Sequence, residues 1–315
     1  MLNTDREFLR LLPRVLRARD FHLYLENGKR LVDLWLAGGK AVLGHKPPRV
    51  LGELKNAAER GLFTPLPHPM ERRFLKAMGE LFPGKAFRLY ANAGALRQAL
   101  AELGISIPDN GLLPDPAFTN GDSDGSTESG TDSNTHSKPD GKGVSSVGGD
   151  MGKKLSLWRP FVGLPADGTL TDGTSSSSQK DAPVLVPFLP WPLGPEALVL
   201  GKDMDASFPA GEIIPPVLLA PATRALYDLL AVIKDGSRVG RVYPKLEKAL
   251  KGGPWQRRGI YLTIEMEAGG EKYTGLFGRF LEGGFLIPPS PVEPLILPAA
   301  MSDGEEAKLA ELLKL

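Results

Sequence analysis

Few residues of this chain stand at spacings that would serve chemistry on their own. The 315 residues include no cysteine, which excludes disulfides, thiolate metal sites and a cysteine nucleophile. None of the four histidines lies at ligand spacing from another or beside a carboxylate pair, so no metal site is expected; they are His22, His45, His68 and His136. The nucleophile elbow, the P-loop and the dinucleotide-binding glycine pattern are all missing. The order of structural elements therefore has to indicate the site.

Composition and charge narrow the classes of partner. The chain has 38 basic and 37 acidic residues, and its net charge of +1 gives no global attraction to nucleic acid or to an anionic membrane. No uninterrupted apolar run is long enough to span a bilayer, and residues 1–19 lack the layout of a signal peptide. We expect a soluble, cytoplasmic protein that binds neither nucleic acid nor membrane.

The N-terminal part of the chain predicts mixed helices and strands. Apolar residues at helical spacing from Phe8 to Leu16 predict an amphipathic helix that Asn3 or Thr4 caps. Pro13 lies inside this run and would bend the helix or delay its start. Asn27-Gly28 predicts a tight turn between two strands, because both residues tolerate a positive φ. The further expected elements are helices over 48–60 and 69–82, a strand over 87–91 and a helix after Asn92.

The C-terminal part predicts a similar alternation, which favours an α/β class. We expect strands over 184–188, 197–200, 260–266, 285–287 and 294–297, and helices over 217–233, 242–250, 273–282 and from 303 to the end. Between the two parts, 14 of the 31 residues from 120 to 150 are Ser or Gly. Such a segment buries too little apolar surface to offset its ordering entropy, so we expect a disordered insertion there and a flexible loop over 166–181.

The order of these elements resembles that of class III aminotransferases, the group that includes glutamate-1-semialdehyde aminomutase. The resemblance is carried by LENGKRLVD at 25–33, GHKP at 44–47, RLYANAGA at 88–95, and the helix and strand around 281–287. It covers roughly residues 8–105 and 195–315. It implies an α/β fold of the PLP-dependent (pyridoxal 5'-phosphate-dependent) transferase type I, with an incomplete large domain over 85–119 and 151–233. Residues 1–84 and 234–315 would form a small α+β domain.

The resemblance also implies a cofactor, a substrate class and an assembly. The family binds PLP, acts on small amino or keto acids and forms homodimers. Lys202 would form the Schiff base, because Pro195, Lys202, Pro209 and Gly211 follow the family's spacing, although Asp205, Ala206 and Ser207 replace three glycines.

The cofactor's phosphate would lie at the helix start formed by Asn92, Ala93, Gly94 and Ala95. Both hydroxyl groups of the family's turn are missing there. The family's pyridine-binding aspartate has no counterpart on a strand, and Trp158 and Trp191 supply aromatic rings without a matching motif.

Two functions remain open from the sequence. One is an active aminotransferase or aminomutase, whose bound cofactor would absorb visible light and be fixed to Lys202 by borohydride. The other is a pseudoenzyme with weakened or lost cofactor binding, which serves as a non-catalytic scaffold or interaction protein.

Overall fold

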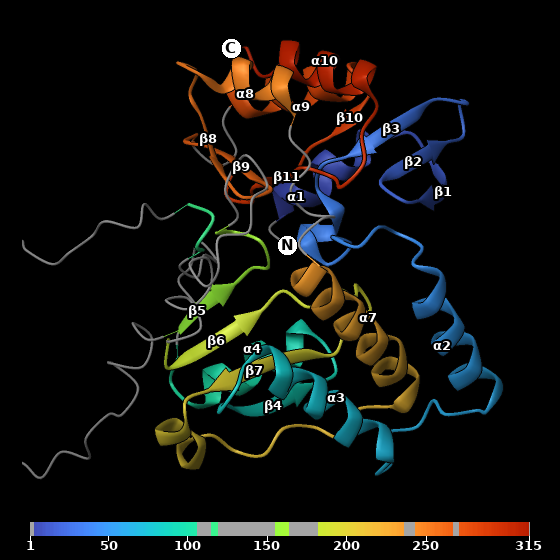
Figure 1. Ribbon diagram of the computed structural model, residues 1–315, viewed down its shortest axis with the longest axis vertical. Helices are drawn as coiled ribbons and strands as arrows, with labels where there is room; N and C mark the ends of the chain where they lie inside the picture. The colour runs from blue at the N-terminus through green and yellow to red at the C-terminus, as the bar shows by residue number, and fades with distance from the viewer. Residues whose placement is uncertain are drawn as a thin grey trace, which may run out of the picture.

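The computed structural model describes residues 3–105, 115–118, 155–163, 182–235, 243–266 and 271–314. These residues form a mixed α/β structure with three sheets, in the orders β1-β2-β3-β10, β11-β9-β8 and β4-β7-β6-β5 (Figure 1). The first two sheets lie at one end of the molecule with α1, α8, α9 and α10, and the third lies at the other end with α2, α3, α4 and α7. The segments expected to be disordered or flexible, 120–150 and 166–181, lie outside the described residues.

The first sheet is built around the predicted hairpin. Its members are β1 (Val15–Arg19), β2 (His22–Leu25), β3 (Arg30–Asp33) and β10 (Phe285–Leu286). The β2–β3 turn contains Gly28 at φ +79°, as the Asn-Gly pair predicts. The short β10 pairs in parallel with β3, which joins the two ends of the chain in one sheet.

The N-terminal helix is shorter than the sequence predicts. Helix α1 (Asn3–Arg10) ends three residues before Pro13, which has no N–H to continue the hydrogen-bond ladder. Val15 and Leu16, which were expected on the helix's apolar face, belong to edge strand β1 and are 45% and 70% exposed. The prediction was wrong there because a run of apolar residues fitted the helical period across a proline.

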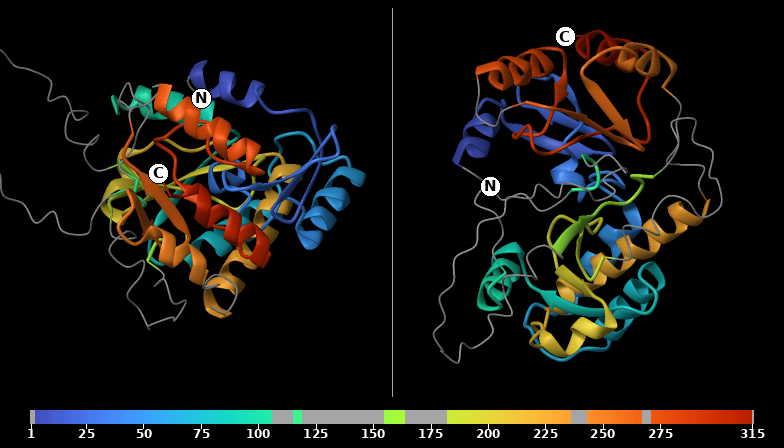
Figure 2. Two further views of the ribbon diagram at one scale, coloured as in Figure 1. Left: turned by 90° about the horizontal axis from the view of Figure 1, so that it is seen from above. Right: turned by 90° about the vertical axis from the view of Figure 1, so that its left-hand side faces the viewer.

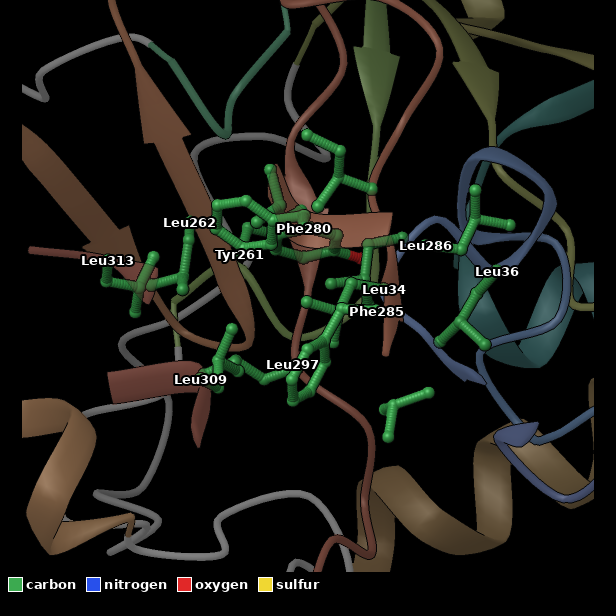
Figure 3. Packing of buried hydrophobic residues seen from close by; sticks show 14 of the residues in the cluster. Leu34, Leu36, Tyr261, Leu262, Phe280, Phe285, Leu286, Leu297, Leu309 and Leu313 are labelled. Atoms are coloured by element: carbon green, nitrogen blue, oxygen red, sulfur yellow. The ribbon is translucent and has the colours of Figure 1, made fainter. Parts of the chain in front are cut away.

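The second sheet and the C-terminal helices share a core with the first sheet. They comprise β8 (Trp255–Arg258), β9 (Tyr261–Ile264), β11 (Leu295–Ile296), α8 (Pro244–Leu250), α9 (Glu271–Glu282) and α10 (Asp303–Leu312). Leu34, Phe280, Phe285 and Leu309 meet in this core (Figure 3). The sequence predicted each of these elements except β8, whose residues WQRR carry little strand signal.

The third sheet is buried on both faces. It consists of β4 (Ala86–Tyr90), β5 (Leu155–Trp158), β6 (Val184–Pro187) and β7 (Glu196–Leu200), of which only the β5–β6 pair is parallel. Along β7, Ala197 and Val199 join one apolar cluster, whereas Leu198 and Leu200 join another on the opposite face. This double burial explains why β7 is continuously apolar after Glu196 rather than alternating.

Helices cover both faces of the third sheet. Helix α4 (Ala93–Glu102) lies on one face, and α3 (Pro69–Leu81) and α7 (Pro216–Asp235) cluster on the other, with α2 (Pro48–Glu59) packed against α7. Figure 2 shows this group apart from the C-terminal helices. Residues 48–81 therefore pack with residues 216–235. The domain division expected from the sequence places the first range in the small domain and nearly all of the second in the large domain. That division remains a prediction.

Helix α7 is the one described helix that is long and apolar enough to cross a membrane. More than half of its most apolar window, 56%, is buried inside the protein, where Leu219, Leu226 and Leu229 contact α2 and α3. This burial is typical of the core helix of a soluble domain.

Replacing Glu305 should weaken the fold more at neutral pH than in acid. Burial alone would raise the pKa of this carboxyl, but hydrogen bonds from the backbone and hydroxyl of Ser302 and from His22 lower it below its usual value. A lowered pKa stabilises the folded state above the unfolded pKa, and this stability is lost as pH falls through the folded pKa. We expect Glu305→Gln to reduce the free energy of unfolding at pH 7 by on the order of 1 kcal/mol.

Urea unfolding at pH 7 and pH 3 measures this difference. The difference between the two proteins should be smaller at the lower pH. A loss of equal size at both values would show that the carboxylate charge is not what stabilises the start of α10.

Candidate functional site

The candidate Schiff-base lysine lies at the far end of the third sheet from the candidate phosphate site. Strands β4 and β7 are antiparallel, with Ala86 opposite Leu200 and Tyr90 opposite Glu196. Lys202 follows Leu200 and is exposed, close to Gly84. Asn92 instead follows Tyr90. The four residue steps between Ala86 and Tyr90 alone span about 14 Å, so one PLP molecule cannot contact both groups.

The helix start at Asn92 is already satisfied by protein groups. The Asn92 Oδ1 accepts hydrogen bonds from the amides of Gly94 at 2.9 Å and Ala95 at 3.1 Å. The Glu212 carboxylate accepts one from the Ala91 amide at 2.7 Å. Two of the amides that would hold a phosphate are therefore used internally, and the nearby Glu212 carboxylate disfavours a second anion.

A different set of residues occupies the carboxyl edge of the parallel strands β5 and β6. Ligands of open α/β sheets bind at this edge. Here β5 leads into Arg159, which is 3% exposed, and β6 leads into Phe188. The Arg159 guanidinium carbon lies 4.0 Å from the centroid of the Phe188 ring and 5.5 Å from that of Tyr261. The edge is therefore filled by a stacked cation and ring.

Each of the three nitrogens of the Arg159 guanidinium also makes a polar contact. Its Nε donates to both carboxylate oxygens of Asp115 at 2.8 Å, and its Nη2 lies 2.7 Å from Asp115 Oδ2. Its Nη1 donates to the carbonyl of Gly38 at 3.0 Å. A buried pair of opposite charges costs little only when it is hydrogen-bonded this completely.

The turn that supplies the Gly38 carbonyl has an unusual backbone. Leu36, Ala37, Gly38 and Gly39 have φ values of +49°, +53°, +70° and +105°. Leu36 and Ala37 carry side chains in this left-handed region, which costs on the order of 1 kcal/mol or more each. The surrounding contacts must therefore hold the turn in place.

Buried Asp33 is the main group that holds this turn. Its Oδ1 accepts the amides of Trp35 at 2.8 Å and Leu36 at 2.9 Å, and its Oδ2 lies 2.8 Å from His45 Nε2. His45 belongs to the 44–47 motif, whose Gly44 is needed because a Cβ there would lie 3.2 Å from the Asp20 carbonyl. The motif thus has a structural role in this chain.

A second lysine, Lys40, lies near the carboxyl edge of β5 and β6, and like Arg159 it is engaged in an ion pair. Lys40 Nζ forms an ion pair with Glu196, the residue opposite Tyr90. Trp35 Nε1 donates to Glu293 at 2.6 Å. Sequence reasoning missed the pairs Arg159–Asp115 and Lys40–Glu196, because their partners are 44 and 156 residues apart and share no motif. The sequence drew attention to the aromatic ring of Trp158 and not to the arginine that follows it.

The other candidate groups serve as structural contacts. His22 pairs with Glu305, and His68 accepts the Met70 amide to cap α3, while His136 lies outside the described residues. Among the described residues, no group of three His, Asp or Glu side chains could hold a metal ion.

Within the described part of the chain, the candidate PLP-binding groups do not form one site. Lys202 lies at the opposite end of β7 from the Asn92 turn, two amides of that turn are capped beside a carboxylate, and Arg159 and Phe188 lie at the sheet edge.

Comparison with known proteins identifies the fold. No protein-family profile matches the sequence. An uncharacterized protein of Treponema pallidum is 38% identical over 95 residues, which are 30% of this chain and 31% of that protein. Glutamate-1-semialdehyde 2,1-aminomutase of Thermus thermophilus is 28% identical over 82 residues, 26% of this chain and 19% of the enzyme. The chain thus spans about a third or less of the curated relatives it matches.

Solved structures match over nearly the whole chain. Ornithine aminotransferase of Toxoplasma gondii aligns with a TM-score of 0.61 and 16% identity, covering 98% of this chain and 92% of the enzyme. Acetylornithine aminotransferase of Elizabethkingia anophelis aligns with a TM-score of 0.60 and 14% identity, covering 99% and 98%. The described structure therefore shares the mixed α/β fold of these aminotransferases, as the sequence predicted.

Loss of the Asp33 charge should destabilise the protein more than loss of an exposed aspartate. An amide at position 33 can still accept from the two backbone amides through its oxygen, but its NH2 group replaces the carboxylate oxygen that faces His45 Nε2, and the negative charge is lost from all three contacts. We expect Asp33→Asn to lower the free energy of unfolding by about 1–3 kcal/mol. Chemical denaturation measures this, with exposed Asp20→Asn as the matched control. Equal effects of the two substitutions would contradict the role assigned to Asp33.

Proposed function

We propose that this chain is a non-catalytic protein built on the class III aminotransferase fold, with its cofactor binding lost. The observation that carries the proposal is the separation of Lys202 from the Asn92 helix start by the antiparallel pairing of β4 and β7. The filled carboxyl edge supports it independently, since Arg159 and Phe188 lie where a ligand of this sheet would bind. Function depends on such site residues rather than on the fold.

The competing function is that of an active enzyme. The names of the similar proteins suggest a PLP-dependent aminotransferase or aminomutase acting on a small amino or keto acid. That function would need a free lysine near a phosphate-binding turn. Lys40 is near the Asn92 end of the sheet, but its ammonium group is already engaged in an ion pair with Glu196.

Added PLP should not form a specific adduct with this protein. We expect no saturable visible absorbance, and after borohydride reduction peptide mapping should find Lys202 labelled no more than Lys55, another exposed lysine. The physical reason is that, among the described residues, neither candidate lysine lies free beside a turn whose backbone amides are open to a phosphate. A saturable band of one PLP per chain that disappears in Lys202→Ala or Lys40→Ala would contradict the proposal.

We also propose that a second copy of the chain is the partner. Four large apolar side chains are about half exposed or more: Phe63 at 59%, Leu66 at 61%, Leu193 at 58% and Ile213 at 49%. Exposed apolar groups gathered in one region mark interaction surfaces. The homodimers implied by the family resemblance make a second copy the natural occupant.

Hydrogen bonds bring the loops that carry these four residues together. The Val217 amide donates to the carbonyl of Leu62 at 3.0 Å, which joins the loop before α7 to the loop after α2. Glu212 binds the Ala91 amide, and Gly194 packs closely against the Ala91 carbonyl. The loop after α2 therefore lies beside the start of α7, and the loops that carry Leu193 and Ile213 meet at Ala91, just before α4.

The groove beside this region suits pairing with an identical copy. It has a volume of about 500 Å³ and is lined by residues that include Glu71 and Arg72. A surface that carries both charge signs can complement itself across a two-fold axis.

A charge in this region should dissociate the dimer. We expect Phe63→Asp to raise the dissociation constant at least about 100-fold, because a buried, unpaired charge costs several kcal/mol. Sedimentation velocity over a range of protein concentrations measures this. The control is Leu16→Asp, at an equally apolar and exposed position on β1, which should leave the dimer intact. A monomeric wild-type chain would rule out the second copy as partner.

A further inference from the structure

The guanidinium of Arg159 is bound as a ligand would be. One carboxylate, that of Asp115, faces it with both oxygens, and one carbonyl, that of Gly38, accepts a further N–H. The Phe188 ring lies beneath its plane and the Tyr261 ring lies farther out. A carboxylate fork and an aromatic face are the groups that recognise a planar cation in proteins.

These groups come from different parts of the fold. Phe188 follows β6 in the third sheet, Tyr261 lies in β9 of the second sheet, and Gly38 lies in the turn after β3 of the first sheet. Asp115 belongs to the short described segment 115–118. All four groups therefore contact the same guanidinium. Each contact is made to the side chain of Arg159 and not to its main chain.

The segment that carries Asp115 is held independently of Arg159. The Asp115 Oδ1 also accepts the Ala117 amide at 3.0 Å, and Ala117 is buried in the first core. Arg258 Nη1 donates to the Pro116 carbonyl at 3.0 Å. Tyr261 is fixed as well, because its hydroxyl donates to the Pro160 carbonyl at 2.8 Å. The surroundings of the guanidinium should thus keep their arrangement when the side chain is removed.

We propose that Asp115, Phe188, Tyr261 and the Gly38 carbonyl form a binding site for a planar guanidinium-type cation, which the chain's own Arg159 fills. In the variant Arg159→Ala, the emptied site should bind a free guanidinium or methylguanidinium ion. The proposal rests on the proposed loss of cofactor binding. It adds that an internal guanidinium occupies the carboxyl edge of β5 and β6 in place of a cofactor. The cation measurement below is separate from the PLP titration, so either can fail without the other.

The test compares the stabilities of variants with and without the free cation. We expect Arg159→Ala to reduce the folding equilibrium constant about 100-fold, because the carboxylate of Asp115 is left buried without a partner. Guanidinium chloride at low millimolar concentration, against sodium chloride of equal ionic strength, should recover part of this loss in a saturable way. Arg224→Ala is the control, because Arg224 pairs with Asp228 on the outer face of α7 and leaves no enclosed site.

A second variant removes the anion together with the cation. Arg159→Ala/Asp115→Asn should be more stable than Arg159→Ala, since no unpaired charge is buried, and guanidinium should no longer stabilise it. If Arg159→Ala is unfolded in buffer, circular dichroism of the same sample should show the fold returning with guanidinium. The proposal is overturned if guanidinium stabilises Arg159→Ala no more than Arg224→Ala, fails to refold it, or acts equally on the double variant.

Discussion

The described structure depends most on the contacts that the buried guanidinium of Arg159 makes. It joins the carboxyl edge of the third sheet to Tyr261 of the second sheet and to the turn that follows the first. The turn is left-handed at Leu36 and Ala37, and Asp33 holds it in position. The left-handed backbone of this turn is unfavourable in conformational energy, and two buried charged residues, Asp33 and Arg159, stabilise it. In an enzyme of this fold, a cofactor would be expected at such a meeting point.

The register of the third sheet is the basis for proposing that the likeness in fold does not extend to the chemistry. The expected lysine and the expected phosphate turn both exist, and each stands at the right place in the chain order. The antiparallel register of β4 and β7 nevertheless places them at opposite ends. The likeness to ornithine and acetylornithine aminotransferases, at 16% and 14% identity, concerns the path of the backbone.

Local signals in the sequence predicted most of the fold. Asn27-Gly28 indicated the hairpin, and prolines at the first turns of α2 and α3 indicated where those helices begin. The N-terminal helix was overextended, because periodicity alone does not register that Pro13 ends the ladder. The edge strand β1 was missed for the same reason.

The candidate site was much less predictable. The spacing around Lys202 matched a motif, but no local pattern states which strand pairs with β7 or in which direction. Asp115 and Arg159 are 44 residues apart, on either side of a Ser- and Gly-rich segment, so only the folded structure reveals their pairing. A crystal structure of the protein grown with saturating PLP tests the account most directly. The account predicts Arg159 between Asp115 and Phe188 with no cofactor at the edge of β5 and β6. Density for PLP at that edge, with the guanidinium displaced, would contradict it.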